Sequence, residues 1–268
     1  MIYLRKLSRN TSPIHANAQF PFNVPVIKSL ESLVLNSEVT FLVGENGSGK
    51  STLLEAIACA VGSITVGSES VLSDPTLREV RQLAKTFKLS WGKKTKRGFF
   101  LRAEDFFGYA KRISQLRSEF EDELHEVEER YEGRSEYAKG LAKMPYAREL
   151  REIQEKYGEG LDTNSHGESF LSLFQSRFVP GGLYLLDEPE APLSPVRQLG
   201  FISLLKQMVG QEAQFIISTH SPIIMAYPGA EILSFDNARI ERVAYDDVEH
   251  VSLTKGFLND PDRYLHHL

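Results

Sequence analysis

Hydrophobic residues in this chain gather in short runs that alternate with longer amphipathic stretches. Three runs, at residues 39–43, 184–186 and 215–218, are rich in β-branched or aromatic residues, and each ends in a polar cluster. Such runs are typical of buried parallel strands, whereas the stretches between them are long enough to form helices. The pattern therefore predicts an α/β fold built on a parallel core sheet.

Shorter strand-like segments flank these three runs and are separated from one another by turn residues. Turn residues between short strands favour antiparallel pairing, so we expect antiparallel β additions around the parallel core. The flanking segments are residues 2–7, 24–27, 33–35, 231–235 and 239–244.

The segment 111–156 differs from the rest of the chain because close to half of its residues are charged. Its apolar residues between Ile113 and Tyr131 recur at spacings of three and four, which places them on one face of a helix. A second helix is expected to follow Pro145, which suits an early helical position, and to end at Gly158. The pattern predicts a helical hairpin whose charged residues form a solvated face.

This hairpin sets the expected domain organisation. Single α/β domains often reach about 250 residues, so 268 residues suit one domain with an insertion. We expect a single domain over residues 1–268, with a helical subdomain inserted at 105–180. Two helices of about 25 residues reach at most about 37 Å each, which excludes a long coiled coil.

The composition excludes several classes of protein. Hydrophobic residues make up 41% of the chain and charged residues 25%, as in soluble globular proteins and unlike fibrous or disordered chains. No apolar run approaches the roughly 18 residues that cross a membrane, and the N-terminal residues do not form a secretory signal. The single cysteine, Cys59, cannot form an internal disulfide and is interpreted as a small core residue. A cytoplasmic protein is expected.

The net charge of -5 argues against a sequence-wide affinity for nucleic acid. A local basic cluster after Trp91 leaves nucleic acid open as a partner. A solvated turn between two strands accounts for the same residues. The cluster consists of Lys93, Lys94, Lys96 and Arg97.

Residues 44–52 carry the strongest chemical signal. Their sequence, GENGSGKST, fits the P-loop pattern G-x-x-x-x-G-K-[ST] and lies between the strand at 39–43 and a helix predicted over 52–61. Backbone N–H groups of such a loop converge on phosphate oxygens at the start of the helix. Lys50 is predicted to reach the β and γ phosphates of ATP, and the Ser51 hydroxyl to ligate Mg²⁺. The residues expected to bind the nucleotide are Asn46, Gly47, Ser48, Gly49, Lys50, Ser51 and Thr52.

Two further strand ends carry polar side chains. Asp187 and Glu188 follow the apolar run at 184–186, and His220 follows the run at 215–218. A carboxylate at a strand end can be held near Mg²⁺, and a neighbouring carboxylate can accept a proton from attacking water. We expect Asp187 to hold the metal, Glu188 to act as the base and His220 to polarise or sense the γ-phosphate.

The other histidines near the end of the chain have no acid or cysteine at metal-ligand spacing. They are interpreted as ordinary surface residues. They are His250, His266 and His267.

Together with Ser165-His166-Gly167-Glu168-Ser169, these motifs resemble the ATP-binding cassette (ABC) ATPase superfamily over nearly the whole chain. The signature of that family, L-S-G-G-Q, opens a helix and contacts the γ-phosphate bound by the opposite subunit. The chain matches it at Ser165 and Gly167 and departs from it at Asn164 and His166. Ser165 and Glu168 also form a capping box, so a helix start is expected there.

The resemblance implies further roles. Residues 190–194 look like the loop that senses the opposite site across a dimer interface. Glu104 is the best candidate for the position that the family fills with a glutamine, and it completes an implied Mg²⁺ ligand set with Ser51 and Asp187. A plain surface glutamate is the alternative for Glu104. The aromatic residue that contacts adenine is left open, with Tyr3 and Phe22 as candidates.

The departures from L-S-G-G-Q make the chain look less like a transporter subunit and more like the SMC/RecF-like ATPases, especially small stand-alone bacterial proteins of the AAA-family ATPase type. The implied function is hydrolysis of ATP that drives a conformational switch in an ATP-dependent homodimer, with DNA maintenance or defence as one setting. The alternative is the ATPase subunit of a membrane transporter, which would need a separate transmembrane partner. A third hypothesis, an ATP-dependent binding module without hydrolysis, is disfavoured because Glu188 and His220 are both present.

Overall fold

The computed structural model describes residues 1–10, 19–65, 70–157 and 166–266. The chain forms two compact units. The first contains Met1–Ala103 and Phe178–Leu268, and the second contains Glu104–Arg177.

The first unit is built on a six-stranded sheet with the order β5-β6-β7-β3-β8-β9. All neighbouring strands are parallel except β8 and β9. Strands β3 and β7 are buried along their whole length, as expected for parallel strands that are covered on both faces. The predicted α/β fold with a parallel core is confirmed. The strands are β3 (Val39–Val43), β5 (Phe100–Arg102), β6 (Leu183–Asp187), β7 (Gln214–Ser218), β8 (Glu231–Ser234) and β9 (Glu241–Arg242).

A separate antiparallel sheet has the order β2-β1-β4, which confirms the expected antiparallel additions. Its strands are β1 (Leu4–Arg9), β2 (Ser32–Val34) and β4 (Phe87–Trp91). The basic cluster that begins at Lys93 follows β4 in an exposed loop, where Arg97 donates a hydrogen bond to the carbonyl of Pro180.

The strand expected at residues 24–27 is wrong. This segment forms the short helix α1 (Pro25–Ser29) with Pro25 at its first position. A proline suits that position because its missing N–H would have no helical partner there.

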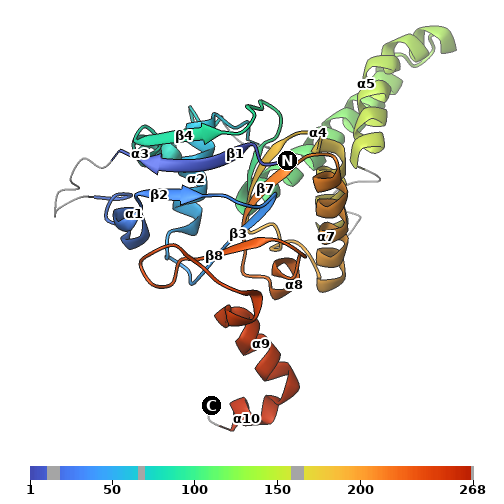
Figure 1. Ribbon diagram of the computed structural model, residues 1–268. Helices are drawn as coiled ribbons and strands as arrows, with labels where there is room; N and C mark the ends of the chain where they lie inside the picture. Colours follow the sequence, from blue (N-terminus) through green and yellow to red (C-terminus); the bar gives the residue numbers. More distant parts are fainter. Residues whose placement is uncertain (11–18, 66–69, 158–165, 267–268) are drawn as a thin grey trace. The chain divides into compact units, whose positions relative to one another are not determined.

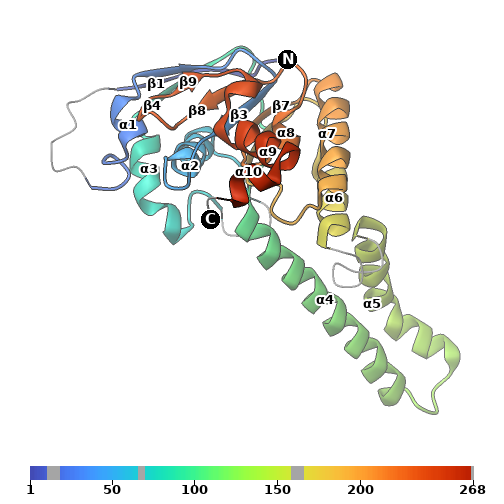
Figure 2. The same cartoon turned by 90° about the horizontal axis from the view of Figure 1, so that it is seen from below.

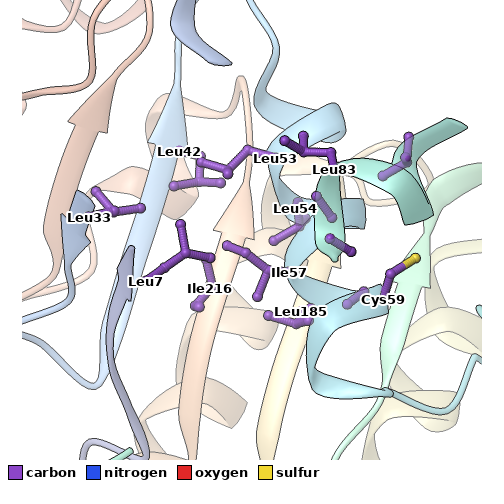
Figure 3. Packing of buried hydrophobic residues seen from close by; sticks show 14 of the residues in the cluster. Leu7, Leu33, Leu42, Leu53, Leu54, Ile57, Cys59, Leu83, Leu185 and Ile216 are labelled. Carbon is purple, nitrogen blue, oxygen red and sulfur yellow. The ribbon is translucent and has the colours of Figure 1, made fainter. Parts of the chain in front are cut away.

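Two helices, α2 (Lys50–Val61) and α7 (Pro195–Gly210), cover opposite faces of the six-stranded sheet (Figures 1 and 2). The buried side chains of α2 pack against both sheets. Figure 3 shows Leu54 and Ile57 of α2 beside Leu7 of the antiparallel sheet and Ile216 of β7. Cys59 belongs to the same cluster and is 9% exposed, so its interpretation as a core residue is confirmed.

Gln214 joins the two sheets by hydrogen bonds. Its side chain is fully buried, and Oε1 accepts from the backbone N–H groups of Tyr3 and Leu4 at 2.8 and 2.9 Å. Its Nε2 donates to the carbonyl of Leu4 at 3.0 Å. One side chain therefore satisfies three backbone groups in Tyr3 and in Leu4, the first residue of β1.

The remaining short elements of the first unit surround these sheets. Among them, α9 packs against α8 and η2. They are η1 (Pro75–Leu77), α3 (Arg78–Ala84), α8 (Pro222–Met225), η2 (Tyr245–Asp247), α9 (Glu249–Asn259) and α10 (Pro261–Leu265).

The second unit contains the predicted helical hairpin, in which α5 (Glu136–Tyr157) runs back along α4 (Ala103–Arg130) (Figure 2). An ion pair between Lys143 and Glu128 and a ring contact between Phe120 and Tyr146 link the two helices. The predicted start of the second helix is wrong, because Pro145 lies inside α5. Alanine, leucine and lysine precede this proline, and their high helix propensity allows the helix to continue through it. The helix α6 (His166–Arg177) follows.

No helix in the described part of the chain combines the length and the hydropathy that a bilayer span requires.

Candidate nucleotide-binding site

The loop between β3 and α2 forms a cradle of backbone groups. Helix α2 begins at Lys50, and Gly49 precedes it in the left-handed conformation with φ of 105°. A Cβ atom at Gly49 would lie 2.7 Å from Cγ1 of Val24 and 2.8 Å from Cγ1 of Val26, so only glycine fits there. The N-cap residue Gly49 has no side chain to cap α2, which leaves the N–H groups of its first turn available to an anion.

Lys50 is held inside this loop and is 4% exposed. Its ammonium donates hydrogen bonds to the carbonyls of Gly44 at 2.7 Å and Glu45 at 2.8 Å. Burial lowers the pKa of Lys50, while the nearby carboxylates of Glu188 and Asp187 oppose that shift. The ammonium is thus placed where charged phosphate oxygens would be stronger partners than two neutral carbonyls.

A cavity of about 450 Å³ opens beside the loop, which suits a small organic ligand. Glu188 and all of the predicted nucleotide-binding residues from Asn46 to Thr52 except Ser48 line it. Ser48 lines a neighbouring cavity of about 490 Å³.

Phe20 forms part of the wall of the first cavity and is 47% exposed. The two aromatic residues considered from sequence lie elsewhere. Tyr3 is buried, and Phe22 packs against the core cluster. Among the described aromatic residues, the structure therefore brings Phe20 to the cavity. No periodicity in the sequence indicated this position.

Asp187 ends β6 opposite Ser218 of β7. Its Oδ1 atom is buried and has no hydrogen-bond partner among the described residues. Burial raises the pKa of Asp187, although the neighbouring hydroxyls of Ser218 and Ser51 oppose the shift. A buried carboxylate oxygen without a partner, next to the Ser51 hydroxyl, fits a hard divalent cation.

The described residues contain no group of three or more histidine, cysteine, aspartate or glutamate side chains that could hold a metal ion by themselves. A cation at Asp187 and Ser51 therefore needs further oxygen ligands, such as those of bound phosphates and water.

Glu188 adopts a backbone conformation that is rare for a residue with a side chain, with φ of 49°. Its N–H donates to the carbonyl of Ser218 at 2.9 Å, which ties the turn to β7. Its side chain remains 43% exposed. Strained backbone of this kind costs on the order of 1–3 kcal/mol and concentrates at functional sites.

His220 follows β7 and faces Glu188, with Nε2 at 3.7 Å from Oε1 of Glu188. Nε2 is buried and has no hydrogen-bond partner in the described chain. The backbone N–H of His220 donates to Oε1 of Glu190 at 2.6 Å. Burial lowers the pKa of His220, and the charge of Lys50 and the ring of His250 add to the shift. A neutral imidazole is therefore favoured at this position.

The interpretation of His250 as an ordinary surface residue is wrong. Its Nε2 atom lies 3.2 Å from Nδ1 of His220, and the two ring centroids are 4.9 Å apart. No local spacing could have indicated this contact, since it depends on where α9 packs. His266 is exposed, in agreement with its interpretation, and His267 lies outside the described residues.

Two further acidic residues lie at the site, and neither was named individually in the sequence analysis. Burial raises the pKa of Glu190, whose Oε2 has no hydrogen-bond partner among the described atoms. Asp236 accepts a hydrogen bond from the N–H of Glu45 at 2.9 Å and so restrains the loop. Asp236 follows β8, which lies next to β3, so the strand-end rule that found Asp187 could also have found it.

The remaining predicted site residues lie in the second unit, and some of them lie outside the described residues. Glu104 lies in the first turn of α4, and Gly167 lies in the first turn of α6. Ser165 and Asn164 lie outside the described residues. The roles of Glu104, Ser165 and Gly167 stay predictions.

The sequence over residues 15–163 matches the AAA domain family, and this segment is more than half of the chain. The chain belongs to the AAA domain family. This membership places it in a family of P-loop ATPases, in agreement with the resemblance drawn from the motifs.

Solved structures with a similar course of the chain include two kinds of protein. The Smc head domain of Pyrococcus furiosus is 12% identical to this chain, with a TM-score of 0.47. The match covers 97% of this chain and 99% of the Smc head domain chain. An ATP-binding cassette of an ABC transporter in its ADP conformation is 17% identical, with coverage of 98% and 96% and a TM-score of 0.46. The SMC head domain from Thermotoga maritima is 17% identical, with coverage of 90% and 98% and a TM-score of 0.42. No curated protein sequence matches the chain.

Proposed function

We propose that this AAA domain hydrolyses ATP at the site formed by the P-loop, Asp187, Glu188 and His220. One observation carries the proposal. The ends of β3, β6 and β7 bring a buried lysine, a buried carboxylate oxygen without a partner and a Glu188–His220 pair to one place in the first unit.

The P-loop would bind the phosphates of ATP. The free N–H groups at the start of α2 and the ammonium of Lys50 supply the positive charge that three phosphate groups need. Phe20, in the wall of the cavity, offers an apolar ring on which the base can stack. These contacts select a nucleoside triphosphate and leave its γ-phosphate toward Glu188.

Ser51 and Asp187 would hold Mg²⁺, and the resemblance adds Glu104 as a third ligand. When bound, Mg²⁺ supplies charge that neutralises the phosphate oxygens. The unpartnered Oδ1 of Asp187 supports this role, because a buried carboxylate oxygen without a hydrogen bond is costly unless a ligand satisfies it.

Glu188 would accept a proton from the attacking water. The water oxygen bonds to the γ-phosphorus as the bond from that phosphorus to the ADP oxygen breaks, and Glu188 takes the proton that the water loses. The Nε2 atom of His220, directed toward Glu188, would donate a hydrogen bond to a γ-phosphate oxygen.

We further infer that ATP closes a homodimer, in which Ser165 and Gly167 of one subunit contact the γ-phosphate held by the other. The support for this step is the match to the ABC signature. Repeated binding, closure and hydrolysis would then act as a conformational switch.

Substitution of Asp187 tests the proposed chemistry. Asp187→Asn should lower Mg²⁺-dependent phosphate release at least about 100-fold, because the metal loses a charged ligand, while ATP binding falls much less. Asp262→Asn, an exposed aspartate in α10, is the matched control and should behave like the wild type. Equal loss of binding and hydrolysis in Asp187→Asn, with a lowered unfolding temperature, would indicate a folding defect and contradict the assigned role.

A further inference from the structure

Helix α9 reaches His220 through the side chain of His250. Its Nε2 atom lies at hydrogen-bond distance, 3.2 Å, from Nδ1 of His220. The two rings meet edge to face, with an angle of 74° between their planes. This arrangement suits a hydrogen bond in which one imidazole nitrogen donates and the other accepts.

The fold holds His250 in place from both sides. Val248 and Val251 are 4% and 0% exposed, so they anchor the start of α9 in the core. Just before them, the hydroxyl of Tyr245 donates a hydrogen bond to the carbonyl of Pro222 at 3.0 Å. Pro222 lies two residues after His220. The segment that carries His250 is therefore fixed to the segment that carries His220.

The direction of the hydrogen bond follows from what faces the other nitrogen of His220. A neutral imidazole carries one proton, on Nδ1 or on Nε2. Nε2 faces the carboxylate of Glu188 at 3.7 Å, and a carboxylate or a phosphate can only accept a hydrogen bond. A proton on Nε2 thus lets His220 donate to Glu188 or to a phosphate, and it leaves Nδ1 as an acceptor that needs a donor.

We propose that His250 is a positioning residue whose Nε2–H donates to Nδ1 of His220 and so keeps the proton of His220 on Nε2. The proposal rests on the proposed ATPase site, since it assigns His250 a role through His220 and no contact with the nucleotide. It makes helix α9 a support of the catalytic site. A displaced α9 would leave Nδ1 of His220 without its donor.

Two substitutions at residue 250 separate the donor from the rest of the side chain. His250→Gln keeps an amide N–H at about the reach of Nε2, whereas His250→Leu keeps the bulk and removes the donor. We expect His250→Leu to lower kcat about 10- to 100-fold, the usual range for partners that orient a functional histidine, with the Kd for ATP changed less than about twofold. His250→Gln should restore kcat to within a few-fold of the wild type. His125→Leu, an exposed histidine in α4, is the matched control.

Nitrogen NMR of histidine-labelled protein reads the position of the proton without any turnover. In the wild type and in His250→Gln, His220 should be protonated at Nε2, and its Nδ1 signal should show an accepted hydrogen bond. His250→Leu should lose that hydrogen-bond shift, and His220→Gln identifies the signals by their absence.

A proton on Nδ1 of wild-type His220 would overturn the proposal. So would an unchanged kcat in His250→Leu, or a loss of kcat that His250→Gln does not rescue. If the wild type releases no phosphate from ATP, the proposed function fails, and the NMR result alone then decides the assignment of His250.

Discussion

Single residues at the site hold polar atoms that the described protein leaves without hydrogen-bond partners. They include Oδ1 of Asp187, Oγ of Ser48, Oε2 of Glu190 and Nε2 of His220. Each buried polar group without a partner costs on the order of 1–3 kcal/mol. These residues therefore lower the stability of the free protein, and a ligand that satisfies them would stabilise the site.

Lys50 provides the most direct prediction at this scale. Lys50→Ala should weaken ATP binding at least about 100-fold, because it removes the charge that balances the β and γ phosphates. Isothermal titration calorimetry measures the affinity, with Lys206→Ala in the exposed face of α7 as the matched control. An affinity of Lys50→Ala close to that of the wild type would contradict the assignment of the P-loop.

Elements with one dominant local signal were predictable from sequence. The three apolar runs became β3, β6 and β7 with bounds that differ by at most one residue, because buried parallel strands are apolar along their length. The segment at 24–27 was not predictable in this way, since its apolar residues fit a strand or a buried helix equally well. Only the packing of Val26 and Ile27 into the core decides for α1.

The same distinction holds for the site. Lys50, Asp187 and His220 follow apolar runs, so the rule that parallel strands end at one edge of a sheet brought them together in the prediction. His250 lies on a helix outside the sheet, and its partner is thirty residues earlier in the chain. Phe20 reaches the cavity through the path of its loop. No periodicity encodes either placement.

Gln214 links two elements and gives a prediction about stability. Gln214→Leu should lower the free energy of unfolding by about 3 kcal/mol, because the N–H groups of Tyr3 and Leu4 lose their acceptor and the carbonyl of Leu4 loses a donor. Urea unfolding measures the change, and Gln207→Leu in the exposed face of α7 is the control. Equal stability of both variants would show that the two sheets are joined by apolar packing alone.

At the scale of the whole molecule, the proposed switch requires two chains for each active site. In the proposed dimer, one chain would supply Lys50, and the signature residue Ser165 would come from its partner. Neither Lys50→Ala nor Ser165→Arg should hydrolyse ATP alone. A mixture of the two can form a dimer with one site in which both elements are intact, so partial recovery of phosphate release is expected.

The mixing experiment has clear controls. Each variant is measured alone at the total protein concentration of the mixture, and the wild type is diluted with Lys50→Ala in the same proportions. Hydrolysis by Ser165→Arg alone at the wild-type rate, linear in protein concentration, would contradict the shared site and favour an ATPase that acts as a monomer.

The proposed site of ATP hydrolysis is the place where Glu188 faces His220. Phosphate release by Glu188→Gln, measured together with its ATP affinity, tests this most directly, and Glu79→Gln on the exposed face of α3 is the matched control. We predict that Glu188→Gln binds ATP as tightly as the wild type and releases phosphate at least about 100-fold more slowly, because the water loses its base. Phosphate release by Glu188→Gln at the wild-type rate would contradict it.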